Sequence, residues 1–304
     1  MAGAAGAALA MGIVGALLAW APLFDRWAPL ALDRPLPEAR WQPAARRALL
    51  VSVDGLAPRV LELSDAPTLS RLARQGARAR EARSVVPSIT LTAHTTLLSG
   101  LGPERHGVLW NRYQPWSAVA VPTVFGTCAA RGLRCGLFAG KPKFAHFAEG
   151  EPGVERYRLG RDDGAVLGAA AAYTRERDPD LLVIHLAEVD LAGHAEGWGS
   201  PAQRDAVRRA DRVLGEFLEA FRAASSRPFT LLLTADHGGR GTRHGSDHAD
   251  DVAVPWILYG DGVAPGAALP DAGALDAAPT LLAILGLRAP AEWPGRARFP
   301  LAGR

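Results

Sequence analysis

Short apolar runs alternate along the chain with segments of helical periodicity. The apolar runs lack the strict polar/apolar alternation of a half-exposed strand, which indicates strands that are buried on both faces. In the helical segment 202–223, residues Leu214, Phe217 and Phe221 fall near one face, and charged residues occupy the rest. The predicted strands are 48–53, 134–139, 181–186, 229–234 and 254–259, and the predicted helices include 68–75, 90–99, 164–177, 202–223 and 275–285. This order predicts an α/β fold with a mostly parallel central sheet covered by helices on both faces.

The chain begins with an apolar stretch. Residues 2–24 contain no charged side chain, which is long enough to span a bilayer, and Ala19-Trp20-Ala21 resembles a signal-peptide cleavage site. No Lys or Arg precedes the stretch, so a buried Ala-rich helix is the alternative. Residues 25–47 are rich in proline and charge and are typical of a linker. We therefore expect a signal peptide or membrane anchor (1–24), a linker (25–47) and a folded domain (48–304), exported to the cell envelope as a periplasmic or extracellular protein.

Lysine is almost absent from the composition. Of the 34 basic residues, Lys141 and Lys143 are the only lysines, and 31 acidic residues leave a net charge of +3. This balance argues against a nucleic-acid-binding surface, which needs a concentrated basic patch. Hydrophobic residues at 48% exclude a disordered chain. Composition leaves the oligomeric state open.

The two cysteines and one glycine-lysine pair exclude some classes of site. Cys128 and Cys135 could form a disulfide after export, or remain buried thiols. Neither is followed by the x-Pro-x-Arg that a sulfatase nucleophile would need. Gly140-Lys141 is followed by proline and lacks the earlier glycine of a P-loop.

Aspartates and histidines gather directly after the predicted strands. Asp54 follows the first strand, Asp190 and His194 follow the third, and Asp236 and His237 follow the fourth. Ligands of such sheets bind outside the carboxyl ends of the strands. The four-residue spacing of Asp190 and His194 would place both on one side of a helical turn.

A sixth side chain of this kind, His244, lies in a glycine-rich loop before the last strand. Each of these motifs alone has an ordinary explanation as a turn, a helix cap or a solvated pair. Zinc accepts imidazole and carboxylate ligands, and two neighbouring metals need about six protein ligands. Because the six lie in one expected crevice, the sequence predicts a metal centre.

Hydroxyl side chains cluster at the start of the helix predicted at 90–99. Ser88, Thr90 and Thr92 could simply cap the helix or lie on its surface. Alternatively, a hydroxyl at a helix N-terminus is placed where a phosphate binds, and an adjacent metal would stabilise its alkoxide as a nucleophile. Composition alone does not choose between the three.

Together these motifs resemble the alkaline phosphatase superfamily, specifically its nucleotide pyrophosphatase/phosphodiesterase (type I phosphodiesterase) branch. The resemblance extends from about residue 48 to the C-terminus. The similar segments are 51–56, 87–94, 102–108, 188–194, 234–239, 244–247 and 277–287. It implies an alkaline-phosphatase-like fold and a hydrolase that acts on a small phosphorylated substrate.

The resemblance also implies a set of ligands for two divalent metal ions, expected to be Zn²⁺. One ion would be held by Asp54, Asp236, His237 and the Thr90 oxygen, and the other by Asp190, His194 and His244. Thr90 would attack the phosphorus and form a phosphothreonine intermediate. His248 competes with His244 for the last position, but the distance to the next strand fits His244 better.

The sequence departs from the family at a position that commonly carries asparagine, which here is Ala93. Asn111 could supply the amide from a nearby loop, or it could be an ordinary turn residue. Lys141 and Lys143 follow the strand predicted at 134–139. They are either solvated or positioned to bind a phosphate or carboxylate of the substrate.

The substrate class depends on which of these features dominates. The family branch favours phosphodiesters or nucleotide pyrophosphates, whereas the two lysines favour phosphomonoesters or phosphonates. A phosphoglycerate-mutase-like isomerase is an alternative, but that branch carries a serine nucleophile and a large inserted domain, for which this chain leaves little room. An envelope binding protein with a vestigial site is another alternative, but it would be expected to have lost ligands.

Overall fold

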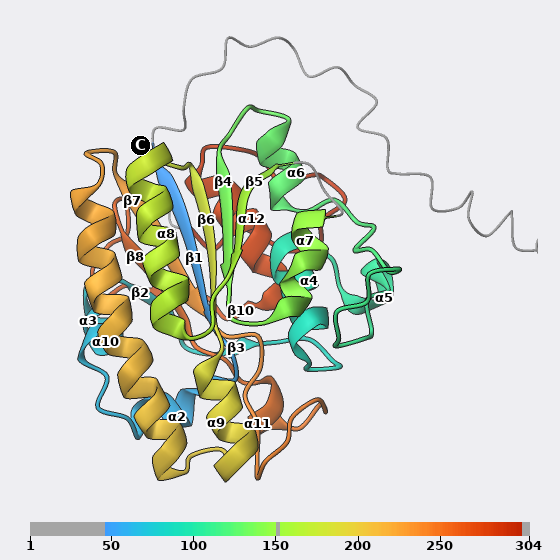
Figure 1. Ribbon diagram of the computed structural model, residues 1–304, viewed down its shortest axis with the longest axis vertical. Coiled ribbons are helices and arrows are strands. Elements are labelled where there is room, and N and C mark those ends of the chain that lie inside the picture. Colours follow the sequence, from blue (N-terminus) through green and yellow to red (C-terminus); the bar gives the residue numbers. More distant parts are fainter. Residues whose placement is uncertain (1–45, 150–152, 300–304) are drawn as a thin grey trace, which may run out of the picture. The chain divides into compact units, whose positions relative to one another are not determined.

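The fold is built around an eight-stranded sheet in a computed structural model that describes residues 46–149 and 153–299 (Figure 1). In sheet order, its strands are β5 (Val154–Leu159), β4 (Cys135–Ala139), β6 (Leu181–Leu186), β1 (Arg47–Val53), β7 (Phe229–Thr234), β8 (Trp256–Gly260), β2 (Ala77–Ala79) and β9 (Ala268–Leu269). The first five run parallel, and β8 is antiparallel to both β7 and β2. Strands β3 (Ala82–Arg83) and β10 (Ala272–Gly273) form a separate parallel pair.

Helices cover the sheet on both faces, as the sequence predicted (Figure 1). One face carries α3 (Pro67–Gln75), α8 (Asp163–Arg177) and α10 (Pro201–Ala223), and the other carries α4 (Thr90–Ser99), α6 (Val124–Ala129) and α12 (Ala277–Ile284). Beyond the carboxyl end of β1 lie α2 (Pro58–Glu62), α9 (Glu188–Glu196) and α11 (Ala249–Val252). The remaining short helices are α5 (Pro103–His106), η2 (Pro142–Phe144), α7 (Ala145–Glu149) and η3 (Ala274–Asp276).

The central strands form the core of the domain. Every residue of β1, β4, β6 and β7 is buried, which accounts for their continuous apolar character. Helix α10 begins where Ser200 caps it by accepting a hydrogen bond from the Gln203 amide. Its buried face includes Leu214, Phe217 and Phe221, so the predicted amphipathic pattern is confirmed.

All five predicted strands are confirmed within two residues of their expected ends. The last strand starts at Trp256 rather than at residue 254, because Pro255 has no backbone N–H for the ladder. Strand β5 was not predicted, since it carries charged residues and lies at an exposed edge of the sheet. The short strands β2 and β9 offered too few residues for a pattern.

The strand register brings the ends of four strands to the same level. Val53 of β1 pairs with Leu186 of β6, and Ser52 pairs with Thr234 of β7. Ala139 of β4 is level with the β6 residue His185. The residues that follow these strands therefore converge at one edge of the sheet.

Residues 1–45 lie outside the described part, so the expected signal peptide or anchor and most of the linker stay predictions. Within the described ranges, no helix combines the length and the apolar character needed to cross a bilayer. Cys128 and Cys135 are both buried and free.

Candidate metal centre and active site

The carboxyl ends of the central strands bring the predicted ligands together. Asp54 directly follows β1, and Asp236 and His237 follow β7. Helix α9, which follows β6, carries Asp190 and His194 one turn apart. The crevice predicted from the strand map is therefore present.

The predicted ligands comprise two groups, and one histidine of the second group is much more exposed than the rest. The inner cradle consists of Asp54, Asp236, His237 and Thr90, which are at most 1% exposed. The outer cradle consists of Asp190, His194 and His244, and here the His194 side chain is 45% exposed. Grouped by distance, the potential ligand atoms form two clusters: Asp54, Asp236 and His237, and Asp190, His237 and His244, so His237 lies near both.

In the inner cradle, one imidazole nitrogen faces two carboxylates. His237 Nε2 lies 3.3 Å from Asp54 Oδ1 and 3.3 Å from Asp236 Oδ2. On the other side of the ring, Nδ1 is 2.9 Å from the Gly238 carbonyl, so Nδ1 carries a proton and donates it. Asp236 Oδ1 accepts from the amides of Gly55 and His237 at 3.2 and 3.0 Å. Asp236 Oδ2 and His237 Nε2 have no hydrogen-bond partner and could therefore bind one cation together.

The inner cradle has the electrostatics of a site that favours a cation. Burial raises the pKa of Asp236, and the nearby charge of Asp54 raises it further. Burial would lower the pKa of His237, but the charges of Asp236 and Asp54 raise it to about 9. The two carboxylates therefore create a strongly negative potential at the His237 ring, which favours a cation there.

The outer cradle shows the same chemistry nearer the surface. The Nδ1 atoms of His194 and His244 donate to the carbonyls of Thr242 and Ser88, at 2.9 and 2.7 Å. Their Nε2 atoms lie only 3.1 Å apart, and Asp190 Oδ1 is 3.4 Å from one and 3.6 Å from the other. Nδ1 protonation makes both Nε2 atoms acceptors, so these three atoms also converge without a donor between them.

A divalent cation fits both cradles. Metal-ligating histidines usually donate their second ring N–H to a carbonyl or carboxylate, as all three do here. Five ligand atoms are buried without any hydrogen-bond partner: Asp54 Oδ1, Thr90 Oγ1, Asp190 Oδ1, Asp236 Oδ2 and His237 Nε2. Buried polar atoms are normally paired, and a donor set of imidazole, carboxylate and hydroxyl suits Zn²⁺.

Thr90 is the first residue of α4, and its position fits the predicted nucleophile. Its carbonyl accepts from His94 Nδ1 at 2.8 Å, and the same nitrogen is 3.5 Å from Asp236 Oδ2. His94 thus links Thr90 to Asp236 of the inner cradle, and the buried Thr90 hydroxyl has no hydrogen-bond partner. Thr90 also lies at a helix N-terminus, which favours an anion. The alternatives Ser88 and Thr92 are engaged elsewhere, because their hydroxyls donate to backbone carbonyls.

Asn111 is held in a fixed orientation beside Thr90. Its Oδ1 accepts from the Leu91 amide at 3.0 Å and from Lys143 Nζ at 2.8 Å. Burial, together with the charge of Lys141, lowers the pKa of Lys143 to about 8. Asn111 is thus not a free turn residue, and its amide nitrogen remains available to donate.

The two lysines have different surroundings, although only one residue separates them. Lys141 Nζ lies 2.6 Å from Asp54 Oδ2 and 2.6 Å from Asp190 Oδ2, and so joins the two cradles. Burial would lower the pKa of Lys141, but the charges of Asp54 and Asp190 raise it above its ordinary value. The interpretation of both as a solvated pair is wrong, since both side chains bond within the crevice.

Two buried histidines were given no role from the sequence. His185 Nε2 is 2.7 Å from Asp54 Oδ2, and burial lowers the His185 pKa to about 4. His94 Nε2 is 2.9 Å from the Ser52 hydroxyl. The sequence feature that could have indicated a role was His185 itself, a histidine within the otherwise apolar strand β6. In the sheet, His185 pairs with Ser52 of β1.

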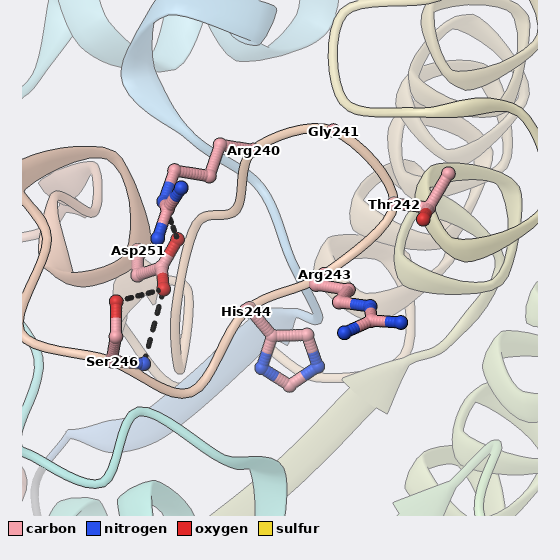
Figure 2. A pocket seen from close by; sticks show the side chains of 7 residues that line it. All are labelled: Arg240, Gly241, Thr242, Arg243, His244, Ser246 and Asp251. Atoms are coloured by element: carbon pink, nitrogen blue, oxygen red, sulfur yellow. Dashed lines mark hydrogen bonds and ion pairs between the residues drawn. The ribbon is translucent and has the colours of Figure 1, made fainter.

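A pocket of about 420 Å³ opens beside the outer cradle (Figure 2). Its lining includes His244, Arg240 and Arg243, and Arg240 lies 3.8 Å from Asp251. His248 instead caps α11, where its Nδ1 accepts from a backbone amide. The structure thus brings His244, and not His248, to the crevice.

Comparison with known proteins agrees with this geometry. A family model described as type I phosphodiesterase / nucleotide pyrophosphatase matches residues 48–124, and a metalloenzyme superfamily model matches residues 153–289. Fold and ligand set together define an alkaline-phosphatase-like metalloenzyme. Within that superfamily, residues 48–124 match the type I phosphodiesterase / nucleotide pyrophosphatase family, which agrees with the motifs in this part of the chain.

The individual similarities are partial. Human ectonucleotide pyrophosphatase/phosphodiesterase family member 7 is 29% identical over 223 residues, which are 65% of this chain and 48% of that protein. A 2,3-bisphosphoglycerate-independent phosphoglycerate mutase of Rhodopseudomonas palustris is 38% identical over 123 residues, or 38% of this chain and 23% of that one. The structure of murine ectonucleotide pyrophosphatase/phosphodiesterase 5 superposes with a TM-score of 0.68 at 16% identity, covering 84% of this chain and 98% of that one. This chain spans about half the length of the family member 7 proteins.

Proposed function

We propose that this protein is a metal-dependent hydrolase that cleaves phosphodiesters or nucleotide pyrophosphates through a phosphothreonine intermediate. The observation that carries the proposal is that five of the thirteen unpartnered buried side-chain atoms of the described residues belong to the predicted ligands and nucleophile. The match of residues 48–124 to the family supports the reaction class. The N-terminal apolar stretch supports export to the cell envelope.

The two cradles would each hold one divalent cation, with Zn²⁺ favoured by the donor set. Asp54, Asp236, His237 and Thr90 would bind one, and Asp190, His194 and His244 the other. When bound, the cations would lower the pKa of the Thr90 hydroxyl and offset charge on the phosphoryl and leaving oxygens. Thr90 is only 1% exposed, so its oxygen would be largely shielded from bulk water.

The chain's own groups then account for two displacements at phosphorus. A bond forms between Thr90 Oγ1 and phosphorus as the bond to the leaving oxygen breaks, and water subsequently attacks phosphorus and frees the threonine. Asn111 Nδ2 donates to a phosphoryl oxygen, because its Oδ1 is already held by Leu91 and Lys143. The pocket beside His244 would receive the leaving group.

A phosphomonoesterase or phosphonate hydrolase is the second candidate, and Lys143 is the observation that favours it. Its ammonium reaches Asn111 and is otherwise able to bind a third, charged phosphoryl oxygen. A diester carries a substituent there instead of a charge. Relative rates on the two ester classes therefore distinguish the candidates.

The test compares wild type, Thr90→Ala and the conservative Thr90→Ser on bis(p-nitrophenyl) phosphate and p-nitrophenyl phosphate, with bound metal quantified for each protein. We expect the diester to be preferred, Thr90→Ala to lose turnover, and Thr90→Ser to retain part of it. A Thr→Ala variant of the murine relative is inactive and was solved with AMP. Full turnover by metal-loaded Thr90→Ala would refute the nucleophile, and a metal-loaded wild type without turnover would support a binding protein.

A further inference from the structure

Lys141 occupies the space between the inner and outer cradles, where it contacts one carboxylate of each. We propose that Lys141 is a positioning residue that orients Asp54 and Asp190 and serves as a substitute cation before the metals arrive, and that its charge opposes metal binding more than its positioning assists it. It is not, in this account, a residue that contacts substrate. The inference rests on the two-metal site of the proposed function.

The contacts of Lys141 divide the oxygens of each carboxylate between two tasks. Asp54 Oδ2 receives Lys141 at 2.6 Å and His185 at 2.7 Å, whereas Asp54 Oδ1 has no partner. Asp190 Oδ2 receives Lys141 at 2.6 Å, and Asp190 Oδ1 has none. Each aspartate can therefore offer one oxygen to a metal, and the ammonium fixes which oxygen that is.

The charge of the crevice gives Lys141 its second task. Asp54, Asp190 and Asp236 bring three buried carboxylates together, and such a group is costly without compensating charge. Among the residues that the structure describes, Lys141 is the only lysine or arginine paired with any of the three. Metals would take over this compensation, so the ammonium competes with them electrostatically.

The choice of lysine over arginine fits this placement. The chain uses arginine for every basic position except Lys141 and Lys143. An ammonium is a compact point charge that can bond two oxygens at 2.6 Å, whereas a guanidinium is a wider planar fork. Space is also limited, because a Cβ at the preceding Gly140 would lie 2.7 Å from the Ala187 side chain.

The experiment compares Lys141→Met with the matched control Lys143→Met, whose ammonium contacts Asn111 and no carboxylate. Unfolding midpoints are measured for chelator-stripped and Zn²⁺-loaded protein, and Zn²⁺ affinity is measured by competition with a chromogenic chelator. For Lys141→Met we expect the midpoint to fall at least about twice as far without metal as with it. By linkage, Zn²⁺ affinity should rise by about tenfold. Lys143→Met should keep the wild-type difference between the two midpoints.

Lys141→Met that folds only with metal would be the extreme form of the expected result. Equal losses of stability with and without metal would overturn the inference, because they indicate an ordinary packing role. Unchanged midpoints and Zn²⁺ affinity together with a raised KM would also overturn it, in favour of a substrate contact. Neither readout needs turnover, so a wild type that binds Zn²⁺ without hydrolysing phosphate esters would contradict the proposed function alone.

Discussion

The two cradles use the same ligand chemistry but differ in the exposure of one histidine. Every inner residue is at most 1% exposed, and Asp190 of the outer cradle is equally buried, whereas the His194 side chain is 45% exposed. The inner cradle consists of residues that follow the buried strands β1 and β7, together with the first residue of α4. The outer cradle rests on α9 and on the loop that carries His244. Under the proposed function, the inner cradle would hold the nucleophile, and the exposed imidazole would let the outer cradle exchange its metal with solvent.

Replacing an inner ligand should have the largest effect. In Asp236→Asn, an amide would replace a carboxylate whose free oxygen faces His237 at 3.3 Å. We expect diesterase activity to fall by on the order of 10³-fold and one equivalent of metal to be lost. The metal-free protein should become more stable, because a buried charge is removed.

Asp211→Asn is the matched control, since Asp211 is also buried but accepts from two backbone amides of the α3 region. It should keep both metals and lose some stability. If Asp236→Asn retained its metals and its activity, the inner cradle as described would be wrong.

An outer ligand should be easier to replace. His194→Gln removes an exposed imidazole, and we expect activity at limiting Zn²⁺ to fall by about 10- to 100-fold. Excess Zn²⁺ should restore much of it, because the remaining ligands Asp190 and His244 are still in place. Activity as a function of free Zn²⁺ provides the measurement, and a loss that no Zn²⁺ concentration rescues would erase the distinction between the cradles.

The smallest expected effect concerns Asp163, which holds the start of α9, the helix that carries Asp190 and His194 of the outer cradle. Asp163 Oδ1 accepts from the amides of Ala187 and Glu188 at the start of α9. Burial raises the pKa of Asp163 to about 7. The folded state therefore prefers the protonated form, so stability declines as pH rises from about 4 towards 7 and stays lower above that.

Asp163→Asn keeps the accepting oxygen and removes the charge. We expect it to raise the free energy of unfolding by roughly 1–3 kcal/mol at pH 8, and by less at pH 5. Asp162→Asn is the control, since Asp162 caps α8 at an exposed position. The free energies of unfolding are measured by denaturant titration at both pH values. An equal gain of stability at pH 5 and pH 8 would mean that the buried charge of Asp163 does not destabilise the folded state.

The sequence predicted the parts of the site that follow strands, because parallel strands end at a common edge. Asp54 and Asp236 could be placed in this way, and so could the helical pair Asp190 and His194. The carboxylate contacts of Lys141 could not, since strand order and side-chain reach are set by tertiary packing. The role of His185 was also missed, because a histidine in an apolar strand more often fills a core.

Direct titration of metal-free protein with Zn²⁺ tests the two-cradle account most directly. The account predicts two equivalents per chain in two separable steps, with His194→Gln removing only the weaker step and Asp236→Asn removing the tighter one. A single equivalent, no binding, or loss of the same step in both variants would contradict it.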